Sequence, residues 1–224
     1  YSPYDCTLNP PPSGASATAP TIIAGAGYAS GCTGFNTRGQ MAQLWGTESV
    51  KQVFNLSNTN NVMVQCLEIT DHSNCGFRVG TPLCSENYNG SSNGTYGRNG
   101  IFAAGGNNLS FRWLDVHGFS NRNFLMGGQT DITMSYVNMD AGYMSNWDGD
   151  VGANSYFNGT ILLDHVKNRF AGCSEAYPRS ASFNTADYSN CTDQNDNPPG
   201  YGDGLGAYNT GGNWIFTDSE FSHN

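Results

Sequence analysis

Two aspartates separated by one residue stand out in the segment NWDGDVG, residues 146–152. In an extended chain, residues two apart point to the same side, so Asp148 and Asp150 would present paired carboxylates. Such a pair serves either as Ca²⁺ ligands or as the acid and base that cleave a glycosidic bond. Asp203, in the second Asp-Gly sequence GDGLG, is the third catalytic candidate. The alternative is that these Asp-Gly pairs only mark the starts of strands.

A second group of oxygen ligands lies in DQNDNPPGYGDG, where Asp193, Asn195 and Asn197 alternate like the first ligands of a calcium loop. The segment departs from the EF-hand pattern, because Pro198 stands where the sharp-turn glycine belongs and Gly204 where the bidentate glutamate belongs. Because their oxygen ligands alternate, these three residues remain candidate Ca²⁺ ligands, and Ca²⁺ is the one cofactor that the sequence suggests.

Aromatic and imidazole side chains supply the remaining candidates. The tyrosines in two long polar segments, 70–99 and 168–204, would either stack on sugar rings or pack those segments onto the rest of the protein. They are Tyr88, Tyr96, Tyr177, Tyr188 and Tyr201. His72, His117 and His223 each follow an apolar stretch, and they would act either as a general base or as solvated corner groups.

A repeated apolar spacing indicates the elements that must position these residues. Leu109, Phe111, Leu114 and Val116 alternate, skip one residue and alternate again. Four further copies begin at Val62, Ile132, Ile161 and Trp214. The first positions are 47, 23, 29 and 53 residues apart, which indicates one or two units of roughly 23 to 29 residues per step. A fixed period of this size is typical of a solenoid.

The skipped residue predicts a particular solenoid. Alternation points every second side chain inward, and a kink of two non-core residues turns the chain while restoring the inward phase. A shorter apolar segment precedes each copy, as in GIFAAGG before Leu109, and glycine or asparagine at the corners accepts positive φ. We therefore predict an all-β parallel β-helix with three strands per coil and two long loop excursions.

The ends of the chain are expected to differ from the middle. Residues 1–20 are rich in proline and serine and predict an irregular lead, followed by a single β-helix domain over 21–224. EFSHN carries no recognisable cap, and terminal repeats of solenoids need one. We expect either that the helix continues beyond this point or that another chain stacks there.

Composition and charge narrow the classes of function. The net charge of −9 argues against nucleic acid, which needs clustered Lys and Arg, and no apolar run is long enough to span a membrane. The same charge disfavours an acidic polysaccharide unless a cation bridges the two.

Seven cysteines without zinc or haem spacing indicate a secreted, disulfide-bonded protein. Pairing between near neighbours in the sequence predicts Cys6 with Cys32, Cys75 with Cys84 and Cys173 with Cys191. This scheme leaves Cys66 as a buried thiol in the alternating run VMVQCLEIT.

In its repeated apolar spacing the chain resembles the right-handed parallel β-helix proteins of the pectate-lyase-like superfamily. WDGDVG, GYGDGLGAYNTGGNW and the final HN resemble a group of uncharacterised secreted bacterial β-helix repeat proteins. The resemblance covers about residue 20 to the end and implies extracellular chemistry on polysaccharides. Asn146, Asp148 and Gly149 match the N-x-D-G motif of polygalacturonases, whose adjacent aspartates and later G-H-G are missing. Pectate lyases use Ca²⁺ and a basic residue, and Arg169 and Arg179 are available here.

Two functions are consistent with this sequence. The first is an extracellular β-helix that binds or processes a polysaccharide, as a lyase or a hydrolase, on the face formed by the long loops. The second is a non-enzymatic module that associates end to end in a filament or a surface adhesin. An uncapped last strand favours the second function, and the loop aromatics favour the first.

Overall fold

Parallel β-strands make up almost all of the regular structure in a computed structural model of the chain. One short 3-10 helix, η1 (Tyr28–Ser30), accompanies them among the described residues. The prediction of an all-β chain of parallel strands is confirmed. The structure describes residues 7–35, 37, 39–46, 50–71, 99–119, 121–142, 145–149, 151, 156–171, 203–206 and 211–222.

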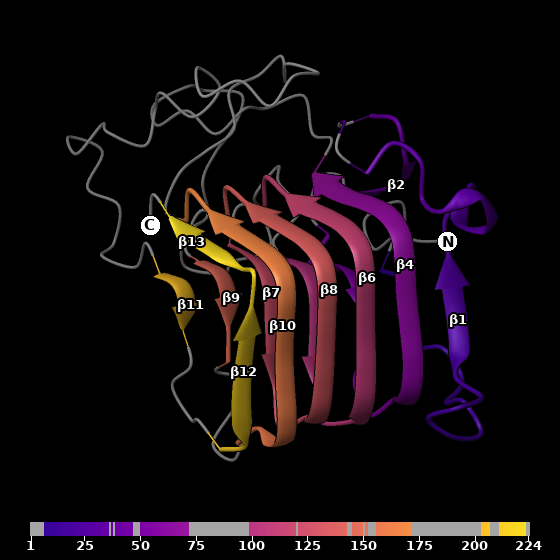
Figure 1. Ribbon diagram of the computed structural model, residues 1–224, viewed down its shortest axis with the longest axis vertical. Helices are drawn as coiled ribbons and strands as arrows, with labels where there is room; N and C mark the ends of the chain where they lie inside the picture. The colour runs from indigo at the N-terminus through magenta and orange to yellow at the C-terminus, as the bar shows by residue number, and fades with distance from the viewer. Residues whose placement is uncertain are drawn as a thin grey trace.

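The strands form two parallel sheets, and the chain alternates between them from β3 to β12 (Figure 1). The eight-stranded sheet contains β1 (Thr21–Ala24), β2 (Ala42–Gly46), β4 (Asn60–Asp71), β6 (Asn107–His117), β8 (Thr130–Asp140), β10 (Asn158–Arg169), β12 (Asn213–Thr217) and β13 (Glu220–Ser222). The five-stranded sheet contains β3 (Gln52–Asn55), β5 (Asn99–Ala104), β7 (Arg122–Gly127), β9 (Ser145–Asp148) and β11 (Asp203–Gly206).

The register of the larger sheet matches the repeated spacing of the sequence. Val62, Leu109, Ile132, Ile161 and Trp214 pair with one another in that order across neighbouring strands. Each separation is therefore one step between adjacent strands. The separations of 47 and 53 residues are single steps lengthened by a long connection, and the interpretation of them as two units is wrong.

A left-handed residue produces the kink in each long strand. Trp113 (φ 49°) in β6, Tyr136 (φ 55°) in β8 and His165 (φ 53°) in β10 occupy the second of the two skipped positions. Pairing continues on both sides of the kink, so the second and third strands expected in each coil form one bent strand. At the two edges of the sheet the halves are separate: β1 and β2 pair with β4, while β12 and β13 pair with β10.

Residues with positive φ also recur at the start of each long strand, where the chain turns a corner. Asn61 (φ 54°), Asn108 (φ 54°) and Asp131 (φ 57°) are left-handed, and Gly159 and Gly212 continue the series. Asn108 Nδ2 donates to Asn61 Oδ1 at 2.9 Å, and Asp131 Oδ1 accepts from the Thr160 N–H at 2.8 Å. Short polar side chains thus bond from one corner to the next, which is why they replace glycine here.

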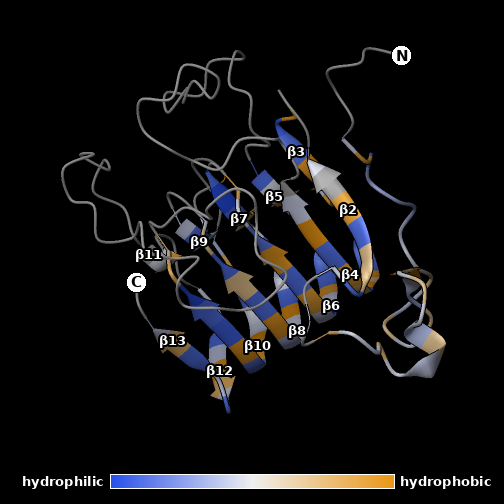
Figure 2. Cartoon of the chain, turned by 90° about the horizontal axis from the view of Figure 1, so that it is seen from above, coloured by the Kyte–Doolittle hydropathy of each residue, from blue (hydrophilic) through white to orange (hydrophobic). Residues whose placement is uncertain are grey.

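The side chains between the two sheets form one apolar core. Figure 2 shows hydrophobic and hydrophilic residues alternating along the strands. Phe111 of β6 contacts Phe124 of β7 edge to face, with ring centroids 5.5 Å apart. Phe216 and Phe221 hold core positions of the repeat but are 51% and 39% exposed. In the described part of the chain, β12 and β13 pair with β10 alone, so one side of these rings is uncovered.

Three asparagines, each fully buried, form a ladder within the protein. Asn123 Nδ2 donates to Asn146 Oδ1, and Asn146 Nδ2 donates to Asn168 Oδ1, both at 2.8 Å. Asn146 also accepts from the Gly142 N–H and donates to the Arg169 carbonyl. The ladder crosses three neighbouring turns of the chain, so it fixes their relative position as well as satisfying buried polar groups.

The irregular segment before β1 lies along the first strands. Leu8 forms a parallel bridge with Phe54, and the Gly14 N–H donates to the Asn60 carbonyl at 2.9 Å. Among the described residues there is no helix with the length and hydrophobicity required to cross a membrane.

Replacing Asn146 with leucine should destabilise the protein by about 3 kcal/mol or more. The change removes the hydrogen bonds of Asn146 to the Gly142 N–H, to Asn168 Oδ1 and to the Arg169 carbonyl, which keeps its bond from the Ala141 N–H. Each buried group left unsatisfied costs roughly 1 to 3 kcal/mol. Urea unfolding measures the loss. Asn213→Leu, at an exposed position of β12, is the matched control and should change stability by no more than about 0.5 kcal/mol. Equal effects of the two variants would contradict a structural role for the ladder.

Candidate functional site

A groove of about 630 Å³ lies over the kinks of the long strands in the described structure. One wall comes from residues 31–35 and Thr37, and the floor comes from β6, β8 and β10 with the end of the β12–β13 turn. The lining residues are Gly31, Cys32, Thr33, Gly34, Phe35, Thr37, Trp113, Tyr136, Asn138, His165, Lys167, Asp218, Ser219 and Glu220.

The kink residues form an aromatic column along the floor. The rings of Trp113 and Tyr136 stack with centroids 6.0 Å apart and planes 14° apart, and Tyr136 stacks on His165 at 4.5 Å and 23°. The guanidinium of Arg112 lies 4.7 Å from the centroid of a Trp113 ring. Because the ring faces cover one another, the column offers mainly ring edges and polar tips to a ligand.

A polar row runs beside the aromatic column. Asp115, Asn138, Lys167 and Glu220 pair in register on β6, β8, β10 and β13, and the last three line the groove. Neighbouring strands are about 4.8 Å apart, so the groove presents one polar side chain at each such step across the sheet. This arrangement suits an extended polar ligand that crosses the strands.

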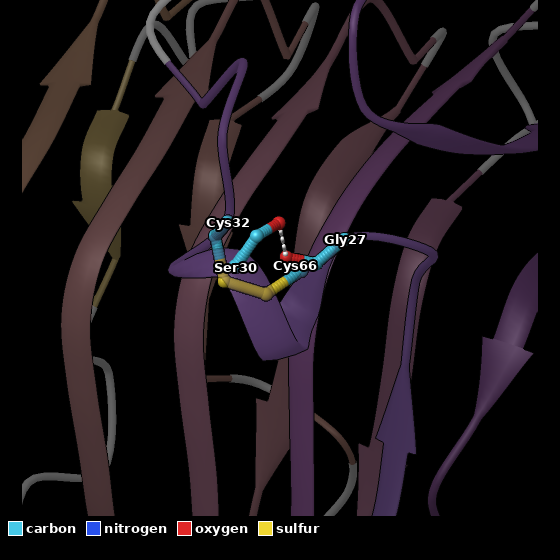
Figure 3. The surroundings of a disulfide bond; sticks show 4 residues. All are labelled: Gly27, Ser30, Cys32 and Cys66. Carbon is cyan, nitrogen blue, oxygen red and sulfur yellow. Dashed lines mark hydrogen bonds between the residues drawn. A yellow bond between two sulfur atoms is a disulfide. The ribbon is translucent and has the colours of Figure 1, made fainter.

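A disulfide between Cys32 and Cys66 attaches the wall of the groove to the sheet (Figure 3). Their Cα atoms are 5.2 Å apart, and Cys66 is the left-handed kink residue of β4. Just before the wall, the Ser30 hydroxyl donates to the Gly27 carbonyl at 2.8 Å (Figure 3). The predicted pairing of Cys32 with Cys6 and the predicted free thiol at Cys66 are therefore wrong. The kink explains the error, because it turns the Cys66 side chain outward from an apparently apolar run.

A buried acid and imidazole provide a second attachment for the wall segment. Glu68 Oε1 lies 3.1 Å from His117 Nε2, and His117 Nδ1 lies 3.3 Å from the Thr70 hydroxyl. Glu68 Oε2 accepts from the Gly39 N–H, which precedes β2. Burial acts to raise the pKa of Glu68, but hydrogen bonds from His117, Gln43 and Gly39 and the charge of His117 outweigh it, so the pKa is lowered.

The environment of His117 contradicts one of the two roles expected of it. The residue is only 2% exposed, so it is not a solvated corner group, and its role as a general base remains a prediction. His117 joins β6 to β4 through Glu68 and Thr70. In the same way Arg169 joins β10 to β8, because its Nε and Nη2 donate to the two carboxylate oxygens of Asp140 at 3.0 and 2.8 Å.

The structure places Asp148 away from the groove. Asp148 ends β9 in the five-stranded sheet, is 5% exposed and accepts a hydrogen bond from Arg122 Nε. Asp203 begins β11 and pairs with Ser145, but its side chain is outside the described structure. Asp150 also lies outside the described residues, so the predicted carboxylate pair remains a prediction.

The other predicted site residues fall in segments that the structure does not describe. These are the five tyrosines Tyr88, Tyr96, Tyr177, Tyr188 and Tyr201, the calcium candidates Asp193, Asn195 and Asn197, the cysteines Cys6, Cys75, Cys84, Cys173 and Cys191, the histidines His72 and His223, and Arg179.

The groove residues were missed by sequence reasoning, although a signal for them exists. Each apolar copy contains two skipped positions, and the second holds Trp113, Tyr136 and His165 in three successive copies. Two adjacent non-core residues in a kinked strand both face outward, so aromatic residues repeated at that position indicate an external column.

Comparison with protein-family models, with curated proteins and with solved structures finds no match to this chain.

Replacing Cys32 and Cys66 together with serine should lower the free energy of unfolding by roughly 4 kcal/mol, because their sequence separation of 34 closes a long loop in the unfolded chain. Urea unfolding of the double variant measures this change. Peptide mapping without reduction should recover a Cys32–Cys66 peptide, and a Cys6–Cys32 peptide would contradict the pairing.

Replacing Glu68 with glutamine should weaken the acid dependence of stability. Because folding lowers the pKa of this carboxyl, its contribution is present above the ordinary value of 4.5 and is lost as pH falls through the folded value. Unfolding measured between pH 7 and 3 should show Glu68→Gln less stable at pH 7, by about 1 to 3 kcal/mol, with a shallower loss in acid. Glu220→Gln, at an exposed position, is the matched control. Parallel profiles for the wild type and Glu68→Gln would refute the assignment.

Proposed function

We propose that this chain is an extracellular right-handed parallel β-helix that binds a polysaccharide in the groove over its kinks. The observation that carries the proposal is the pairing, within one groove, of an aromatic column with a row of polar side chains in register. Ligand sites for polar molecules combine apolar or aromatic walls with a few placed polar groups, and here the ring edges and polar tips of the column lie beside side chains that can bond to sugar hydroxyls.

The β-helix is supported by the path of the chain. From β3 to β12 the strands alternate between two sheets, every pairing among them is parallel, and the 23-residue step from Leu109 to Ile132 returns the chain to the adjacent position. A three-sided coil explains why the long strands bend in the middle. Secretion is supported by the disulfide of the groove wall, because such bonds persist in oxidising compartments.

The groove favours a neutral or weakly acidic polymer. Its charged lining consists of Lys167, Asp218 and Glu220 with the imidazole of His165, and the chain as a whole carries a charge of −9. A strongly acidic polymer would be repelled by that net charge at low ionic strength. The ligand would lie across β8, β10 and β13 and meet Asn138, Lys167 and Glu220 in turn.

Binding has more support than cleavage in the described residues. Asp148, the leading catalytic candidate, is buried and held by Arg122 on the five-stranded sheet. Processing of the polymer at Asp148 would therefore take place away from this groove, while Asp150 and the side chain of Asp203 lie outside the described structure. Analysis of the polysaccharide for new ends after incubation distinguishes binding from cleavage.

End-to-end association is the second candidate function. Ile215, Phe216 and Phe221 on β12 and β13 are 40%, 51% and 39% exposed, and large exposed apolar groups mark association surfaces. Sedimentation velocity over a range of concentrations, without glycan, would detect such oligomers.

Replacing Tyr136 or Lys167 with alanine should weaken polysaccharide binding about tenfold or more, equivalent to roughly 1.4 kcal/mol. A glycan array identifies the ligand, and calorimetry with that oligosaccharide measures the change. Tyr28→Ala is the control, because Tyr28 is 55% exposed but does not line the groove. Wild-type affinity in both groove variants, or an equal loss in the control, would reject the groove as the binding site.

A further inference from the structure

Two neighbouring kinks bring three potential metal ligands together at one end of the groove. Asp164 and His165 occupy the two skipped positions of β10, so the kink turns both side chains outward instead of to opposite faces. Asp218, left-handed with φ 47°, takes the same place between β12 and β13. One ligand atom from each residue lies within 4.8 Å of those of the other two.

The imidazole is already oriented for such a role. His165 Nδ1 lies 2.9 Å from Asp164 Oδ1, and the ring stacks on Tyr136 at 4.5 Å. Two ligands of one metal ion lie about this close together, so an ion that replaces the proton between these two atoms would take Asp164 and His165 Nδ1 as neighbouring ligands.

Asp218 is the third member of the set and has no competing partner in the described structure. It is exposed and forms no hydrogen bond or ion pair with the described residues. His165 and Asp218 both line the groove, so coordination positions not filled by protein would face the cavity.

The required movement is small. Ligand atoms around a four-coordinate zinc ion are roughly 3.4 Å apart, given metal–ligand bonds of about 2.0 to 2.2 Å. Side chains that are 29% exposed at Asp164 and 42% exposed at His165 can close from 4.8 Å by rotation of their terminal bonds. An ion pair between Asp164 and His165 alone would not explain why Asp218 lies beside them. It would also not explain why His165 and Asp218 both line the groove.

We propose that Asp164, His165 and Asp218 bind a divalent transition metal ion, with Zn²⁺ as the best fit, and that the ion's open positions face the groove. A nitrogen ligand with two carboxylates suits zinc and its neighbours, whereas Ca²⁺ takes oxygen ligands alone. Glu220 and Lys167 pair in register beside the site, and their charges offset each other, so the two aspartates set the local field.

Calorimetry with Zn²⁺ alone tests this site independently of any glycan. The wild type should bind one ion with a dissociation constant in the micromolar range and should melt at a higher temperature when Zn²⁺ is in excess. Asp218→Asn and His165→Gln should each weaken binding at least tenfold. Binding that is absent up to millimolar Zn²⁺, or unaffected by both variants, would overturn the proposal.

Asp131→Asn is the matched control, since it removes the same charge at an exposed corner where Asn61 and Asn108 already occupy the equivalent positions. It should bind Zn²⁺ as the wild type does, and an equal loss would assign the effect to general electrostatics. Should a groove variant fail to fold, two-dimensional NMR of the wild-type histidine rings decides the matter. Zn²⁺ must shift the His165 ring resonances first, and a first response at another histidine would reject the site.

Discussion

Every long strand of this protein must turn without losing the inward phase of its side chains, and this constraint governs the rest of the structure. Strict alternation through a bend would send the next apolar residue outward. One residue in the left-handed conformation solves the problem, and it is not glycine in any of β4, β6, β8 and β10. The local penalty of roughly 1 to 2 kcal/mol at each kink is offset by the core side chains that stay buried on both sides of it.

The same constraint determines where chemistry can occur. A kink places two consecutive side chains on the outer face, whereas a straight strand would present only one of them. Stacked over neighbouring strands, these positions form the column of Trp113, Tyr136 and His165 and gather Asp164 with Asp218. The groove is therefore a product of the backbone repeat, and the segment held by Cys32 supplies its wall.

The fold was more predictable than the site for a physical reason. Leu109, Ile132 and Ile161 belong to a pattern that burial repeats on every strand, so spacing alone placed them side by side. The pairing of Cys32 with Cys66 joins a repeat strand to a segment outside the repeat, so no period could indicate it. Asp148 illustrates the same limit, because its motif suggested an open carboxylate while its partner Arg122 lies on another strand, 26 residues away.

Long connections between strands leave the register of the larger sheet unchanged. Val62 pairs with Leu109 as directly as Leu109 pairs with Ile132, although the first connection is about twice as long as the second. Stability in such an array comes from contacts between neighbouring strands, and these contacts do not depend on the length of the connection at a corner. The corners of this scaffold are therefore sites where evolution, or an engineer, can graft new segments, whereas the gain or loss of a single residue inside a long strand would disrupt every layer above it.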